Sequence, residues 1–125
     1  MFRLAGKNDR MNRPFSFDDA VFGSLVAELG EADALEVLQI FLADTADKIA
    51  RLGANGQAIP QIKRQAHSIK SSAATFGFND LSGLARELEF GAETMTPAHL
   101  QESIFELRQA FETTRQFARL NLGSQ

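Results

Sequence analysis

The sequence predicts an all-α protein, folded as an antiparallel up-and-down four-helix bundle with a short extra helix at its N-terminal end. From Phe17 onward, apolar residues recur every three or four positions, which is the spacing of an amphipathic helix. Sustained alternation of apolar and polar residues, which would indicate strands, is nearly absent. Four long amphipathic segments joined by short breaks are expected to pack as an antiparallel bundle.

The short extra helix is expected to begin after Asp18, a residue type that caps helix N-termini, and to end at Gly30. The first long helix should then run from Glu31 to the "GANG" stretch at residues 53–56, which stops it. Its predicted apolar face consists of Ala34, Leu38, Phe41, Leu42, Thr45, Ile49 and Leu52.

The second long helix enters through Pro60, whose missing N–H is not needed in a first helical turn, and closes at Gly77. Its predicted apolar seam consists of Ile62, Ala66, Ile69, Ala73 and Phe76.

The third long helix is expected to be capped by Asn79 and to end at Gly91. Thr96, followed by Pro97, starts the last helix. The inward residues predicted for these two helices are Leu81, Leu84 and Leu88, and then Leu100, Ile104, Leu107, Phe111, Thr114, Phe117 and, at the very end, Leu120.

The length of 125 residues indicates one domain, with a flexible basic tail at residues 1–14 and the bundle at residues 15–122. A net charge of -3 does not indicate a nucleic-acid binder. The absence of cysteine excludes disulfide scaffolds and thiolate chemistry. No segment has the pattern of a secretory signal or a membrane span, so a cytoplasmic monomer without membrane contact is expected.

His67 is the residue that first indicates chemistry. At roughly 100° per residue it falls outside the apolar seam of its helix, on the solvent side. Most surface histidines are only solvated polar residues, so position alone does not assign a function. His99, in the first turn of the last helix, is given no role. The residues that project to the same side as His67 are Lys63, Arg64, Lys70 and Ser71, with Ala74 extending the strip.

The segment "AHSIKSSAATFGFNDLSGLARELE", residues 66–89, resembles the signature of histidine-containing phosphotransfer (Hpt) domains. The family usually has glycine directly after the lysine, where this chain has Ser71. Serine is still small, so access to the ring should survive, although it could trim a close approach or add a hydrogen bond. The matching residues are Ala66, His67, Ile69, Lys70, Ser72, Gly77, Leu81, Leu84, Leu88 and Glu89.

The resemblance implies a relay of phosphoryl groups between receiver-domain aspartates, with His67 as the nucleophile that becomes phosphorylated. Glu89 lies at the position of the family's hydrogen-bonding Gln or Glu, and would orient the ring through its other nitrogen. Lys70 would hold the phosphoryl oxygens as a point charge. The alternative for Glu89 is an ordinary surface glutamate, or a partner of Arg86 one turn earlier.

The chain is expected to be a phosphoryl carrier and not a kinase, because it has no glycine-rich phosphate loop. No cofactor is implied, and the Mg²⁺ for transfer would come from the receiver. The implied partners are response-regulator receiver domains or a hybrid histidine kinase. The expected docking surface consists of Lys63, Arg64, Ser71, Ala74 and Phe78.

Three other interpretations are considered. The bundle could dock a receiver or kinase without passing phosphate, although it would then have no need of the His67, Lys70 and Glu89 set. It could be the phosphate-accepting domain of a larger histidine kinase. It could also resemble the dimerisation bundle of a kinase, which usually needs two chains for four helices. Since one chain supplies all four helices, a monomer is expected. The 125 residues contain no ATP-binding domain and no receiver domain, which favours a stand-alone carrier.

Overall fold

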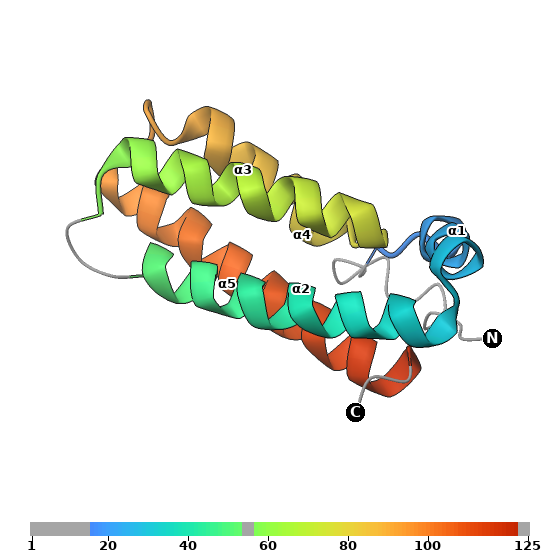
Figure 1. Cartoon of the computed structure of the whole chain (residues 1–125). Coiled ribbons are helices and arrows are strands. Elements are labelled where there is room, and N and C mark those ends of the chain that lie inside the picture. Colours follow the sequence, from blue (N-terminus) through green and yellow to red (C-terminus); the bar gives the residue numbers. More distant parts are fainter. Residues whose placement is uncertain (1–15, 54–56, 123–125) are drawn as a thin grey trace.

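The computed structural model describes residues 16–53 and 57–122, and all five of its helices lie in these ranges. The tail expected at residues 1–14 lies outside the described residues, as does most of the "GANG" stretch. The helices are α1 (Asp19–Leu29), α2 (Glu31–Leu52), α3 (Ile59–Phe76), α4 (Asn79–Gly91) and α5 (Pro97–Asn121) (Figure 1).

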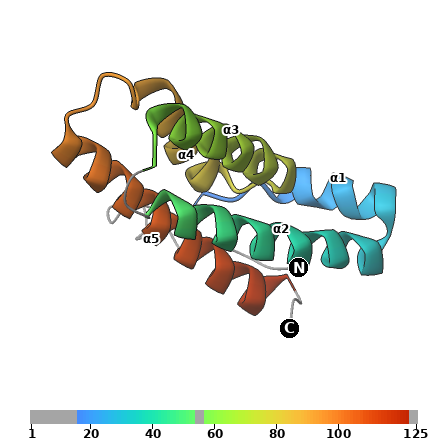
Figure 2. The same cartoon turned by 60° about the vertical axis from the view of Figure 1, so that its left-hand side comes forward.

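The predicted all-α bundle with an extra N-terminal helix is confirmed. Helices α2 to α5 run along one another, and successive helices point in opposite directions (Figures 1 and 2). Helix α1 lies at one end, packed on α2 and α3. The most extensive helix pairing is between α3 and α4, which form a tight antiparallel hairpin.

Most helix ends follow the sequence signals. The Asp18 carboxylate accepts hydrogen bonds from the N–H groups of Ala20 and Val21 at 3.0 and 3.3 Å, which caps α1. The prediction for Asn79 is wrong, because Asn79 is the first residue of α4 and Phe78 occupies the N-cap position. The Asn79 N–H donates to the Ser16 carbonyl at 3.1 Å, so this turn is held by the strand-like segment that precedes α1.

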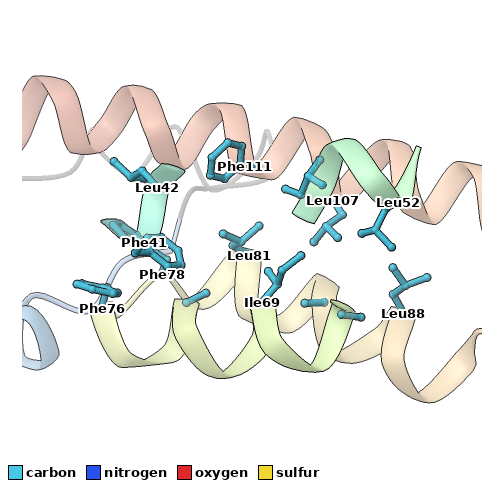
Figure 3. Close-up of a cluster of buried hydrophobic side chains, with 14 of the residues drawn as sticks. Phe41, Leu42, Leu52, Ile69, Phe76, Phe78, Leu81, Leu88, Leu107 and Phe111 are labelled. Carbon is cyan, nitrogen blue, oxygen red and sulfur yellow. The ribbon is translucent and has the colours of Figure 1, made fainter. Parts of the chain in front are cut away.

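The predicted apolar faces of α2 and α3 are buried in full, and they meet the buried residues of α4 and α5 in one core (Figure 3). On α4, Ala85 is fully buried while Leu84 is only partly covered. The prediction for Leu120 is wrong, since it is 73% exposed. The last buried residues at this end of the chain are Ala118 and Leu122. Leu120 is rotated by roughly 200° around the helix from Ala118, so it faces away from the core.

Aromatic rings fill the end of the bundle nearest α1. Phe78 has no exposed surface and packs against Phe17 and Phe41, with ring centroids 5.3 and 5.9 Å apart. The Phe17 ring also lies 4.8 Å from that of Phe117, and Phe41 lies 4.9 Å from Phe76. We call these five residues the aromatic end.

Gly77 allows the chain to turn sharply from α3 into α4. Its φ of 87° is in the left-handed region, where a side chain is strained. Its carbonyl accepts the Asp18 N–H at 2.8 Å, and a Cβ atom at this position would lie 2.7 Å from the Asp18 carbonyl oxygen. The turn therefore needs glycine both for its backbone angle and for the close approach of the segment before α1.

Candidate functional site

His67, Lys70 and Glu89 meet on the outer side of the α3–α4 hairpin. His67 Nδ1 lies 2.8 Å from Glu89 Oε2, and Lys70 Nζ lies 2.9 Å from Glu89 Oε1. One carboxylate of α4 therefore bridges the imidazole and the ammonium of α3. The alternative pairing of Glu89 with Arg86 is not what the structure shows, because the Arg86 guanidinium lies over the Phe90 ring.

Helices α3 and α4 both carry small buried residues and form the most extensive helix pairing of the bundle. Ala66, Ala73 and Ala85 have no exposed surface, and small side chains at a helix contact allow a short distance between the axes. The Ser82 hydroxyl donates to the Lys70 carbonyl at 2.9 Å, which adds a polar tie between α3 and α4. This packing brings a carboxylate of α4 within reach of side chains on α3.

The three side chains differ in exposure. The His67 side chain is 59% exposed, whereas those of Lys70 and Glu89 are only 23% and 15% exposed. The carboxylate is therefore largely covered, while the ring that it holds projects into solvent. A macromolecule approaching this face would meet the imidazole first.

The pKa of the Glu89 carboxyl is lowered, chiefly by its contact with the Lys70 ammonium. Partial burial acts in the opposite direction, and the hydrogen bond and charge of His67 lower the pKa further. Glu89 is therefore ionised at neutral pH and can only accept hydrogen bonds. His67 must donate its Nδ1–H to this carboxylate, so in the neutral ring the lone pair is on Nε2.

A shallow depression of about 650 Å³ lies beside His67, along the first turns of α3 and the end of α4. Two of the residues expected to dock a partner, Lys63 and Arg64, contribute to its wall. Lys63 forms an ion pair with Glu93 at 3.4 Å, and Arg64 is exposed. The lining residues are Ile59, Pro60, Lys63, Arg64, His67, Glu89 and Glu93.

Comparison with known proteins identifies the family. The Hpt domain model matches residues 36–117, which span all of α3 and α4 and most of α2 and α5. The chain belongs to the Hpt domain family. It is a phosphoryl carrier of phosphorelays and not a kinase.

A solved structure supports the same assignment. The chain is similar to the crystal structure of histidine-containing phosphotransfer protein B (HptB) from Pseudomonas aeruginosa PAO1, with 27% sequence identity and a TM-score of 0.59. The match covers 80% of this chain and 94% of that one. The comparison with curated proteins returns no match.

The other residues expected at the docking surface of this Hpt domain differ in their exposure. Ser71 and Ala74 are exposed on the side of α3 that carries His67, and the Ser71 carbonyl accepts the Thr75 hydroxyl at 3.1 Å. The assignment of Phe78 to the docking surface is wrong, because its side chain is fully buried in the aromatic end. Its backbone forms an isolated antiparallel bridge with Phe17, which turns the ring into the core.

Phe90 is an aromatic residue beside this Hpt site that was not predicted from the sequence. Phe90 follows Glu89 directly and is 62% exposed. Lys70 Nζ lies 5.0 Å from the centroid of its ring, and the Arg86 guanidinium carbon lies 5.5 Å from it. The available signal was the spacing of four between Arg86 and Phe90, which places both on one helix face.

Within residues 16–53 and 57–122, no group of three or more His, Asp or Glu side chains has an arrangement that could hold a metal ion. In the same part of the chain, none of the helices combines the length and apolar character needed to cross a bilayer.

Proposed function

We propose that His67 is the residue of this Hpt domain that carries the phosphoryl group, passing it between the aspartates of two-component receiver domains. The observation that supports this most is the contrast in exposure at one hydrogen bond. The ring is 59% exposed while the Glu89 carboxylate that holds its Nδ1 is 15% exposed. An exposed nucleophile oriented by a covered base is the arrangement that transfer between proteins requires.

The transfer step follows from the tautomer. His67 Nε2 uses its lone pair to attack the phosphorus of a receiver aspartyl phosphate. The N–P bond forms as the P–O bond breaks, and the aspartate carboxylate leaves with the bonding electrons. The ring gains positive charge during attack, and the Nδ1–H···Glu89 hydrogen bond stabilises that charge. The reverse sequence delivers the group to a second receiver aspartate.

Lys70 supplies positive charge next to the reacting nitrogen. Its ammonium contacts Glu89 before transfer, and lysine is a flexible point charge with three donors. We propose that it turns part of this interaction toward the phosphoryl oxygens once they are bound to His67. Because Lys70 and His67 are three residues apart on α3, the ammonium can make this change without movement of the helix.

The proposed partners are response-regulator receiver domains, either separate or within a hybrid histidine kinase. Lys63 and Arg64 place positive charge beside His67, which suits the acidic pocket that holds the phosphoryl aspartate and Mg²⁺ of a receiver. Ser71 and Ala74 offer small side chains on the other side of the ring. A monomeric state is proposed, since one chain supplies the helices of the bundle. A cytoplasmic location is proposed together with this function.

The decisive experiment mixes radiolabelled, phosphorylated receiver domains with the wild type, with His67→Gln and with His99→Gln, and follows the label. We expect acid-labile, base-stable label on the wild type and on His99→Gln, and none on His67→Gln. His99→Gln is the matched control because it replaces the only other histidine of the chain, which is also exposed and lies on α5.

Thermal unfolding of each variant separates chemistry from folding. His67→Gln should melt within a few degrees of the wild type, because exposed side chains contribute little to stability. Label retained by a folded His67→Gln variant would contradict the assignment. A wild type that binds receivers but takes no label from any of them would instead indicate a docking module.

A further inference from the structure

We propose that Phe90 is a positioning residue that holds the Lys70 ammonium at the phosphorylation site through a cation–π contact. This inference rests on the proposed roles of His67 and Lys70. It assigns the exposed aromatic ring a function in the transfer reaction that operates through Lys70 and not through direct contact with the phosphoryl group.

The ammonium of Lys70 has two partners on α4. Glu89 Oε1 lies 2.9 Å from Nζ, and the centroid of the Phe90 ring lies 5.0 Å from the same nitrogen. The second distance is within the range of about 6 Å in which a ring face attracts a cation. Consecutive residues of α4 thus confine one side chain of α3, and Lys70 is 23% exposed as a result.

The two partners hold the ammonium in different ways. Glu89 competes with the phosphoryl group, because both offer negatively charged oxygens to the same donors. The Phe90 ring attracts the cation through its quadrupole and accepts no conventional hydrogen bond. The ring can therefore keep Lys70 near His67 while the ammonium shifts from the carboxylate to the phosphoryl oxygens.

Arg86 gives the ring a second cationic neighbour. Its guanidinium carbon lies 5.5 Å from the ring centroid, and Arg86 precedes Phe90 by four residues on the same face of α4. This contact restricts the ring of an otherwise exposed phenylalanine. The order along the surface is then Arg86, Phe90, Lys70, Glu89 and His67, each in contact with the next.

The first test compares the phosphoryl-acceptance rates of Phe90→Leu and Phe90→Trp at subsaturating receiver concentration. Leucine keeps an apolar side chain but removes the quadrupole, so we expect acceptance to slow by about two- to fivefold, the size of an exposed cation–π contact. Tryptophan should restore the wild-type rate, since indole binds cations best. The matched control is Phe105→Leu on α5, a phenylalanine that is 55% exposed, which should leave the rate unchanged.

A double-mutant cycle separates positioning from direct docking. In a Lys70→Met background the ammonium is gone, so Phe90→Leu should cause no further loss if the ring acts through Lys70. The same two- to fivefold loss in both backgrounds would show that Phe90 contacts the receiver directly, and would overturn the proposal.

A measurement without phosphoryl transfer tests the contact itself. In the unphosphorylated protein, the ε-methylene protons of Lys70 should show an upfield ring-current shift that disappears in Phe90→Leu. Absence of this shift in the wild type would overturn the proposal whatever the transfer rates are. Label on His67→Gln would overturn the proposed function and with it the role of Phe90 in transfer, whereas the ring-current shift would still show whether the contact between Lys70 and Phe90 exists.

Discussion

Phe78 and Phe90 lie at opposite ends of α4, and the same type of side chain is buried at one end and exposed at the other. Phe78 is fully buried among other phenylalanines, whereas Phe90 is 62% exposed and contacts two cations. The difference lies in the neighbours and not in the residue type. Apolar rings contact the first position, and charged side chains from α3 and α4 contact the second.

The two regions should therefore respond to different measurements. The aromatic end consists of phenylalanine rings packed on one another, so its contribution is to the free energy of unfolding. The site around His67 consists of exposed or partly exposed charges, which contribute little to stability and instead determine reactivity. Substitutions in one region should leave the property of the other region largely intact.

The largest effect on stability is expected at Phe78. Phe78→Ala should lower the free energy of unfolding by about 3–5 kcal/mol, because it removes a fully buried ring and leaves a cavity. Phe90→Ala should lower it by no more than about 1 kcal/mol, because it removes only exposed cation–π contacts. Urea unfolding of both variants checks this, and equal losses at the two positions would remove the distinction between the regions.

A smaller loss is expected at the turn that closes the aromatic end. Gly77→Ala should lower the free energy of unfolding by about 1–3 kcal/mol, since it places a Cβ atom at positive φ and against the Asp18 carbonyl. The control is Gly83→Ala in the middle of α4, where a Cβ would meet nothing within 4 Å. That variant should gain about 0.5–1 kcal/mol from helix propensity. A thermal melt in which both variants shift in the same direction would contradict this account.

A small stability effect is also expected at Glu89, and this one should depend on pH. The folded-state pKa of Glu89 lies below its ordinary value of 4.5, so its stabilising contribution is present above that pH and is lost as the pH falls through the folded pKa. The wild type should exceed Glu89→Gln by at most about 1 kcal/mol at pH 7. That difference should shrink at pH 2.5, and urea midpoints at the two pH values measure it. A difference that grows in acid would reverse the sign assigned here.

Glu89→Gln should also affect the rate of phosphoryl transfer. Glu89→Gln keeps an acceptor for the Nδ1–H of His67 but removes its charge, so transfer should slow by about tenfold and not stop. Rapid-quench kinetics with a phosphorylated receiver domain measure the rate of phosphoryl transfer. An unaltered rate would exclude Glu89 from the mechanism.

The helices and their buried faces could be predicted because apolar spacing determines which side of a regular helix is covered. The seam of α3 from Ile62 to Phe76 is the clearest case. Phe78 could not be placed in this way, since it lies between two helices and has no period to follow. Its direction is set by the bridge to Phe17, a residue 61 positions earlier in the chain.

The site was only partly predictable for a similar reason. Spacing put His67 and Lys70 on one side of α3, but it left Glu89 free to pair with Arg86 on its own helix. The resemblance to Hpt domains favoured the pairing across helices, which the structure shows at 2.8 Å. The contact of Phe90 with Lys70 depends on the distance between α3 and α4, a quantity that no pattern within one helix contains.

The pairing of α3 with α4 has a consequence for how such a protein can diverge. Every residue of the proposed reaction centre comes from this hairpin, and His67 and Glu89 are separated by 22 positions in the chain. Closing so short a loop costs little entropy, so the reactive geometry is encoded locally. Helices α2 and α5 contribute the cover over its apolar side. Compensated substitutions in α2 and α5 could therefore accumulate during evolution without changing the geometry of His67 and Glu89 in the hairpin.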